Sequence, residues 1–384
     1  MMSWNFVEHF TLLGNGVVTF VLPFLFVLTI IVFVHELGHF LVARWCGIKV
    51  LVFSIGFGPE IVGFNDRHGT RWKVSAIPLG GYVKFFGDDN AASVPDQDKI
   101  AAMDADERRV SFFHKSVGAR AAVVAAGPIA NFLLAIAIFA TIFTIYGKQE
   151  TAPRVDQVSA DSAAAAAGFQ PGDLVLSING SAIESFRDMQ EIVSLNADEP
   201  LIFVVERSGA KVTLRATPRL VVDKDIFGNV HRIGRLGVSQ TNAPEDVKTI
   251  KYTPVGALGA AVRQTWFVVD QTFAYLGKLV VGRASTDQLG GPLRIAQMSG
   301  QAASLGFPTL MNWAGLISVS IGLLNLFPIP LLDGGHLLFY AIEAVRGRPL
   351  SERVQEFGFR IGLALIVMLM IFTVWNDISH FGSS

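Results

Sequence analysis

The chain has 384 residues, of which 51% are hydrophobic and 16% are charged, and its formal net charge is -1. Soluble domains usually carry about 25% charged residues. This composition, together with a mean hydropathy of +0.46, excludes an entirely soluble protein and indicates an integral membrane protein with some soluble mass. No basic stripe is present, so no nucleic-acid partner is expected. The single cysteine, Cys46, has no partner for an internal disulfide.

Four segments are apolar over the length that a helix needs to cross a lipid bilayer, which is about 20 residues. They are roughly residues 15–40, Ala121 to Tyr146, Thr309 to Leu332, and about 357–375. Residues 254–282 carry their charged side chains at spacings that suit an amphipathic helix lying on the membrane. We favour that interpretation of 254–282 over a fifth span.

Lysine and arginine are concentrated between the first and second predicted spans and between the third and fourth. Arg44, Arg71 and Arg120 belong to the first stretch, and Arg346 and Arg353 belong to the second. Short cytoplasmic loops are enriched in these residues. The distribution therefore places both termini outside the cell membrane and the C-terminal end of the first span at the cytoplasmic face.

The first cytoplasmic stretch shows strand patterns. Residues 55–64 and 70–77 alternate on either side of the turn-like Asn65-Asp66-Arg67-His68-Gly69, which predicts a β-hairpin, and Gly80 to Gly87 is a further extended run. Residues 88–110 are polar and are expected to form a mobile loop.

Residues 148–240 are predicted to form a soluble α+β module. Strands are expected at Arg154 to Val158, Leu174 to Ile178, 201–207 and 211–217, with a helical turn after Asp161-Ser162, a tight turn at Asn179-Gly180 and a helix that Ser185 caps and that ends near Leu195. The AGFQPGD…ING pattern of this stretch resembles a PDZ domain, and Gly234 to Val238 resembles its carboxylate-binding loop placed last in the chain. The resemblance implies a groove for peptide C-termini between the Leu236–Val238 strand and the 185–195 helix, with backbone amides near Gly234 meeting the carboxylate.

The first span ends in Val34-His35-Glu36-Leu37-Gly38-His39. Helical periodicity places His35 and His39 one turn apart on one face, where two imidazoles can hold one zinc ion. Glu36 has the position of the general base in this motif. Polar groups are costly in hydrocarbon, so this trio is expected to be functional. The alternative is a pair of helix-end histidines at a membrane surface.

Asp333 is the candidate for a third zinc ligand. It ends the third uncharged span, in the stretch 325–336, and its depth matches that of the histidine motif on the cytoplasmic side. Pro328 and Pro330 interrupt the helix just before it, which a membrane tolerates only where protein or water covers the freed backbone groups. Two alternatives are open: Asp333 could be the N-cap of the next helix, or His336 could be the ligand.

Together these motifs resemble the site-2 protease family of intramembrane zinc metalloproteases. The likeness rests on HELGH in the first span, Gly127-Pro128-Ile129-Ala130-Asn131 in the second, the PDZ-like insert, and NxxPxxxLDGGH over residues 325–336, in the same order over nearly the whole chain. It is strongest to the bacterial regulator of sigma-E protease, which has two PDZ modules where this chain has one. The resemblance implies that His35, His39 and Asp333 bind zinc, that Glu36 is the base, and that Asn325 and the hairpin after Gly58 hold the substrate.

The sequence therefore predicts a polytopic α-helical membrane protein with about four transmembrane helices, a cytoplasmic-side β-hairpin and an inserted PDZ domain. The predicted organisation is a first membrane part (1–147), the PDZ domain (148–240), an amphipathic surface segment (241–300) and a second membrane part (301–384). The resemblance implies a multi-pass protein of the bacterial inner membrane, with its PDZ domain on the periplasmic side. Its expected activity is hydrolysis of transmembrane segments in pre-cleaved membrane proteins, such as anti-sigma factors or remnant signal peptides.

The sequence disfavours two other classes of protein. A PDZ-bearing membrane scaffold with a degenerate zinc site is disfavoured because all four catalytic positions are intact. A transporter, which would also have broken helices and buried polar groups, is disfavoured by the absence of an internal repeat and by the ligand spacing.

Overall fold

The computed structural model describes residues 17–88, 100, 102–183, 185–224, 230–240, 247–281 and 290–381. The chain divides into two units. The first, here called the helical unit, comprises Met1–Phe139, Ala261–Val269 and Gly291–Val374, and the second, the mixed unit, comprises Ala140–Ala260, Asp270–Gly290 and Trp375–Ser384.

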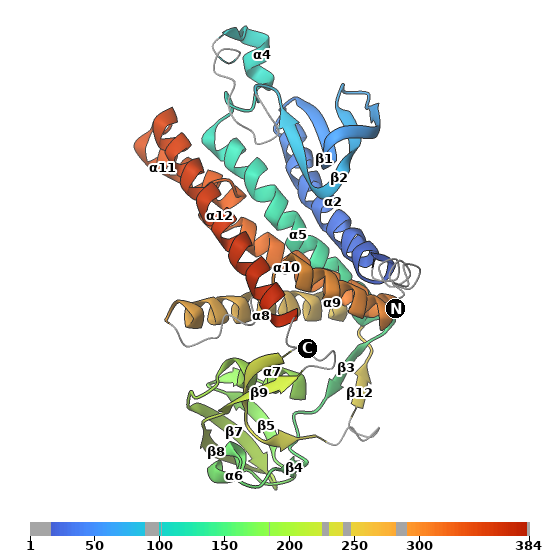
Figure 1. Ribbon diagram of the computed structural model, residues 1–384, viewed down its shortest axis with the longest axis vertical. Coiled ribbons are helices and arrows are strands. Elements are labelled where there is room, and N and C mark those ends of the chain that lie inside the picture. Colours follow the sequence, from blue (N-terminus) through green and yellow to red (C-terminus); the bar gives the residue numbers. More distant parts are fainter. Residues whose placement is uncertain are drawn as a thin grey trace, which may run out of the picture. The chain divides into compact units, whose positions relative to one another are not determined.

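The order of elements alternates helical stretches with strand-rich ones (Figure 1). The helices are η1 (Val17–Val21), α2 (Leu22–Trp45), α4 (Ala105–Val110), α5 (Val117–Ile145), α6 (Ala163–Ala167), α7 (Phe186–Leu195), α8 (Pro254–Val280), α9 (Pro292–Ser304), α10 (Phe307–Asn325), α11 (Asp333–Arg346) and α12 (Glu352–Phe381). The strands are β1 (Val50–Asn65), β2 (Arg71–Phe85), β3 (Lys148–Thr151), β4 (Gln157–Val158), β5 (Leu174–Ile178), β6 (Ser181–Ala182), β7 (Leu201–Arg207), β8 (Ala210–Ala216), β9 (Arg219–Lys224), β10 (Val230–Arg235), β11 (Val238–Ser239) and β12 (Val247–Ile250).

Among the described residues, four helices are long and apolar enough to cross a membrane. They cover Val18–Trp45, Val117–Ile145, Phe307–Asn325 and Arg353–Ser379. The four predicted spans thus correspond to helices of membrane-spanning length and composition, and the chain is a polytopic membrane protein. The third helix ends at Asn325 instead of continuing to Leu332, because Pro328 and Pro330 cannot donate the backbone hydrogen bonds that would extend it. Residues 254–280 form a single helix, α8.

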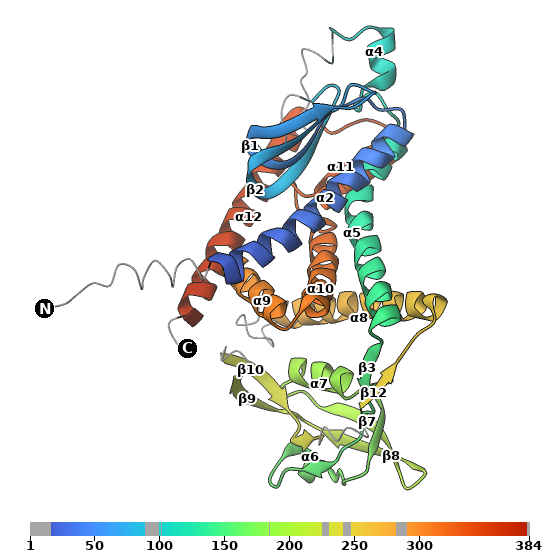
Figure 2. The ribbon, with the colours of Figure 1, turned by 90° about the vertical axis from the view of Figure 1, so that its right-hand side faces the viewer.

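Within the helical unit, α2 packs closely against α5. A Cβ atom at Gly38 would lie 2.4 Å from the backbone oxygen of Ala126, so only glycine allows this approach. On its N-terminal half, α2 packs against α9 and α10 (Figure 2) through an apolar cluster. The cluster contains Val27, Ile31, Ala302, Leu310, Ala314 and Ile317. These contacts fix α2 on two sides, and α2 carries the histidine motif.

The β1–β2 pair also lies against α2. The two strands are antiparallel, and the turn between them is closed by Asp66, whose carboxylate accepts hydrogen bonds from the backbone amides of His68 (2.8 Å) and Thr70 (2.9 Å). Burial raises the pKa of Asp66, but these amides, Trp72 and Arg44 outweigh burial and lower it to about 2. The pair coincides with the predicted hairpin.

The hairpin is bent, and its two strands are attached to α2 by aromatic side chains. Residues 52–55 pair with residues 81–84 and also with residues 71–74, so the extended run predicted from Gly80 is the second half of β2. Phe53 stacks on Trp72 at 4.2 Å between ring centroids and meets Phe40 of α2 edge-on at 5.6 Å. This packing holds the end of β2 beside the histidine motif.

The prediction of a loop over residues 88–110 was wrong for its last part. Ala105–Val110 is the helix α4, and its first turn has a capping box in which the Asp104 carboxylate and the Glu107 side chain each accept from the other's backbone amide. A capping box of this kind satisfies two amide donors that a short helix would otherwise expose. Residues 89–99 and 101 lie outside the described residues.

The mixed unit contains a four-stranded antiparallel sheet in the order β6-β5-β7-β8, with α6 and α7 packed around one buried core. Ser185 caps α7, and Asn179 (φ 50°) and Gly180 (φ 85°) form the turn between β5 and β6, as the sequence predicts. The strand predicted at Arg154 to Val158 is limited to Gln157–Val158. The other described strands of this unit form three antiparallel pairs, β3–β12, β4–β11 and β9–β10.

Candidate metal centre

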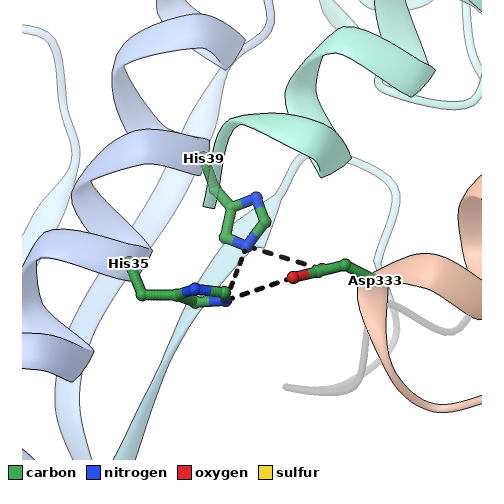
Figure 3. Close-up of side chains that lie close together, drawn as sticks. All are labelled: His35, His39 and Asp333. Carbon is green, nitrogen blue, oxygen red and sulfur yellow. Dashed lines mark hydrogen bonds and ion pairs between the residues drawn. The ribbon is translucent and has the colours of Figure 1, made fainter. Parts of the chain in front are cut away.

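Three side chains from α2 and α11 point at one another (Figure 3). His35 Nε2 lies 3.2 Å from His39 Nε2, as expected for two residues one helical turn apart. The Asp333 carboxylate completes the group, with Oδ2 at 3.2 Å from His35 Nε2 and Oδ1 at 3.5 Å from His39 Nε2. The structure thus brings together the three predicted zinc ligands.

Asp333 is carried by an irregular turn, residues 326–332, and is the first residue of α11. Leu332 is the N-cap residue, so the alternative in which Asp333 caps the helix is wrong. The turn is tight: a Cβ at Gly334 would lie 2.2 Å from Phe327 O, and Leu331 has a φ of 86° that branched or bulky residues rarely adopt. Close backbone contacts therefore position this ligand.

The spacing of the three donors fits zinc. A tetrahedral ion with bonds of about 2.0–2.1 Å holds its ligand atoms roughly 3.3–3.4 Å apart, and the observed separations of 3.2, 3.2 and 3.5 Å bracket that value. Among the described residues, these three side chains are a group whose donor atoms lie close enough together to hold one metal ion. Asp333 Oδ2 is buried and, of the described residues, none donates a well-aligned hydrogen bond to it, which leaves it available to a cation.

Residues of α5 surround the two histidines. A Cβ at Gly127 would lie 2.3 Å from His39 Nε2, so glycine keeps the space at the donors open. His39 Nδ1 is 2.9 Å from the Val123 carbonyl oxygen, and His35 Nδ1 is 3.2 Å from Nδ2 of the fully buried Asn131. Sequence reasoning noted Gly127 and Asn131 as a family motif but gave them no role. The signal that could have found them is a glycine and an asparagine four residues apart on one face of a predicted span.

A cavity of about 220 Å³ opens beside the three donors. Glu36 and Asn325 line it, as the sequence-based assignment requires, and so do Gly81 and Tyr82 of β2. His336 is part of the same wall, 5.5 Å from the Phe359 ring, but it does not belong to the metal-binding group. The alternative in which His336 replaces Asp333 as a ligand therefore finds no support. The role of Gly81 and Tyr82 was not assigned residue by residue from the sequence.

The three residues predicted for a peptide groove lie beside α7 in the mixed unit. Residues 233–238 and α7 line a cavity of about 480 Å³. Val238 is in β11, and Leu236 is only 2% exposed, so its side chain belongs to the core. The prediction for Gly234 needs correction, because Gly234 is in strand β10, paired with Leu220, and not in a loop. The loop is reduced to Leu236 and Gly237, where a φ of 85° at Gly237 makes the turn.

Comparisons with known proteins agree with this site. The sequence profile of Peptidase family M50 matches residues 23–369. A Rhizobium meliloti protein, named as an inferred zinc metalloprotease, is 52% identical over 356 residues, which are 93% of this chain and 95% of that protein. Metalloprotease MmpA of Caulobacter vibrioides is 42% identical over 388 residues, 95% of this chain and 97% of its own length. The chain belongs to peptidase family M50, the site-2 protease family. It is a zinc metalloprotease of a membrane.

Proposed function

We propose that the protein is an intramembrane endopeptidase that cuts peptide bonds within the transmembrane segments of membrane proteins already shortened by another protease. The observation that carries this proposal is the position of the donors. His35 and His39 lie on a candidate span, and Asp333 reaches them from the turn after another span. A metal site built from such helices serves a substrate that is itself in the membrane.

In this proposal His35, His39 and Asp333 hold the zinc ion and Glu36 is the general base. Zinc, when bound, supplies a Lewis acid that polarises the scissile carbonyl and acidifies a water ligand. Glu36 is adjacent to His35 in the chain and lines the same cavity. It would accept a proton from the attacking water on its carboxylate and deliver that proton to the leaving amide nitrogen.

The second half of β2 would hold the substrate. Gly81 and Tyr82 line the metal cavity, and a Cβ at Gly81 would lie 2.9 Å from Glu36 Cγ, so this strand passes directly beside the general base. A transmembrane helix must unwind before a protease can reach its amides. Addition of the unwound segment as a strand to β2 would keep it extended at the donors. Asn325, at the end of α10, would contact the same segment.

Residues 148–240 of the mixed unit are proposed to form a PDZ domain that controls access. Its groove lies between α7 and residues 233–238, and a C-terminus left by an earlier cut fits a groove of this kind. The lysine and arginine distribution supports a bacterial inner-membrane location with residues 148–240 on the periplasmic side and the metal site towards the cytoplasm. Pre-cleaved anti-sigma factors or remnant signal peptides are the proposed substrate classes.

The proposed activity is tested by cleavage of a model transmembrane substrate in proteoliposomes by the wild-type protein and a Glu36→Gln variant. Glutamine preserves size but cannot accept the proton. We expect the variant to bind zinc as the wild type does and to show no cleavage. Near wild-type cleavage by Glu36→Gln would refute the mechanism, and zinc binding without cleavage by the wild-type protein would favour a scaffold.

The gating role has a separate test. Thr151 of β3 pairs with Val247 of β12, so the chain ends flanking the module are adjacent and a short Gly-Ser linker can replace residues 152–246. The shortened protein should cut an untrimmed substrate faster than the full chain and should cut a trimmed one as before. Continued resistance of the untrimmed substrate, with the trimmed one still cleaved, would contradict gating.

A further inference from the structure

The two histidines of the metal centre differ in what holds their second ring nitrogen. His39 Nδ1 lies 2.9 Å from the backbone oxygen of Val123. A carbonyl oxygen only accepts hydrogen bonds, so Nδ1 of His39 must carry the proton and donate it. The lone pair of His39 is then on Nε2, which faces His35 and Asp333 as a metal ligand must.

His35 has an amide in the corresponding place. Its Nδ1 lies 3.2 Å from Nδ2 of Asn131, and Asn131 is 0% exposed. An amide NH₂ group only donates, so this arrangement would require a lone pair on Nδ1 and a proton on Nε2 of His35. That tautomer cannot ligate zinc through Nε2, although Nε2 is the atom that lies 3.2 Å from both His39 Nε2 and Asp333 Oδ2.

The other end of the amide resolves the conflict. Asn131 Oδ1 is buried, and no described residue donates a hydrogen bond to it, so the protein does not fix the orientation of the amide. A half-turn of the side-chain amide exchanges the nitrogen and the oxygen without moving any other atom. The oxygen then accepts from Nδ1–H of His35, just as the Val123 carbonyl accepts from His39.

We propose that Asn131 is a positioning residue that accepts a hydrogen bond from Nδ1–H of His35 and so keeps the Nε2 lone pair directed at zinc. This inference rests on the proposed zinc site and adds the residue that sets the tautomer of one ligand. The backbone carbonyl oxygen of Asn131 accepts a 2.8 Å hydrogen bond from the buried Ser318 hydroxyl, a contact that does not involve the side-chain amide. Outer partners of this kind typically change metal affinity by about 10–100-fold when removed.

Two substitutions separate an accepting role from a donating or packing role. Asn131→Asp offers only acceptors, and Asn131→Leu has a similar volume and no polar atom. Zinc affinity is measured by competition with a chelator on the purified full-length protein in detergent. We expect Asn131→Asp to bind zinc within about threefold of wild type or more tightly, and Asn131→Leu to bind about 10–100-fold more weakly. Ser318→Ala is the matched control for local packing and should bind zinc as wild type does.

The remaining outcomes are also decisive. Equal zinc affinity of Asn131→Leu and wild type would overturn the inference, as would equal weakness of the Asp and Leu variants or a similar loss in Ser318→Ala. A wild-type protein that binds no zinc would instead refute the proposed zinc site.

A second measurement uses the wild-type protein and so does not depend on the folding of any variant. With ¹⁵N-labelled histidine, the zinc-loaded protein should show a protonated, hydrogen-bonded Nδ1 at both ligand histidines. An unprotonated Nδ1 at His35 would overturn the inference.

Discussion

Two carboxylates, one in each unit, have opposite surroundings. In the mixed unit, the side chain of Asp173 is 0% exposed and both of its oxygens accept hydrogen bonds from Arg207, at 2.7 and 2.8 Å, with a further bond from the Gln170 amide. In the helical unit, Asp333 faces two imidazole nitrogens, and its Oδ2 has no aligned donor among the described residues. The protein itself pairs both oxygens of Asp173, whereas Asp333 belongs to a group of side chains that could hold a metal ion.

This difference distinguishes a structural carboxylate from a ligand. A buried charge is tolerated when it is paired and hydrogen-bonded. Arg207 gives Asp173 both an opposite charge and hydrogen bonds. The Asp173 carboxylate also accepts from the Gln170 backbone amide and so closes the turn between α6 and β5. The ligand atoms of His35, His39 and Asp333 lie within 4.8 Å of one another, so this carboxylate faces donors that are spaced to share one metal ion. The two residues should therefore respond in opposite ways to substitution.

The largest effect is expected at Asp333. Asp333→Ala should remove most bound zinc and reduce proteolysis to background, because one of three protein ligands is lost. In the presence of a chelator, the thermal stability of the variant should equal or exceed that of wild type, since an incompletely paired carboxylate has been removed. Metal analysis and thermal unfolding in detergent measure the two effects. Full zinc occupancy in the variant would show that a residue other than Asp333 is the third ligand.

A smaller loss is expected when the turn that carries Asp333 is displaced. Gly334→Ala places a methyl group 2.2 Å from Phe327 O, so the backbone must shift and carry the ligand with it. Because misplacement of a catalytic group by about 1 Å can cost around 100-fold, we expect kcat/KM to fall by about 10–100-fold. Gly118→Ala is the control, since a Cβ at Gly118 meets nothing within 4 Å. Unchanged activity of Gly334→Ala would show that the turn does not position Asp333.

Asp173→Ala should lower stability and leave zinc binding unchanged. Removing it deletes the ion pair of Arg207, which keeps the Gly168 carbonyl oxygen as an acceptor, and because the Arg207 side chain is one-quarter exposed the cost should be about 2–3 kcal/mol in the stability of the mixed unit. Hydrogen exchange at β5 and β7 should rise, while zinc content and cleavage of a trimmed substrate should not change. Loss of zinc in this variant would contradict the separation of the two carboxylates.

The smallest effect concerns pH. Burial raises the pKa of Asp173, but the Arg207 hydrogen bonds, the Gln170 amide and the Arg207 charge outweigh burial, so its folded pKa is below the ordinary 3.8. A carboxyl whose pKa is lowered on folding stabilises the protein above its unfolded pKa and loses that contribution as pH falls through the folded value. The protection factor of the β5 amides, which corrects for the intrinsic exchange rate at each pH, should therefore fall in wild type as the pH is lowered below about 4. Asp173→Asn should show a flatter pH dependence of exchange over the same range.

Much of this site could be predicted from local patterns. His35 and His39 are placed by helix geometry alone, and the uncharged runs identified the four spans. The strands at 174–178 and 201–207 followed from alternation and turn residues. What depends on contacts distant in sequence could not be derived: the strand at Gly234, where a loop was predicted, and the contacts of Gly127 and Asn131 with the histidines. The capping box at Asp104 was a local signal, but it lies in a polar stretch that was predicted to be a loop.

The most direct test of the central claim replaces one ligand with an element that can be recognised. Zinc X-ray absorption of an Asp333→Cys variant should show a sulfur neighbour at about 2.3 Å together with nitrogen neighbours at about 2.0–2.1 Å. The wild-type protein, whose one cysteine is Cys46, should show nitrogen and oxygen neighbours alone. A zinc-loaded Asp333→Cys variant without a sulfur neighbour would contradict the assignment of residue 333 as a zinc ligand.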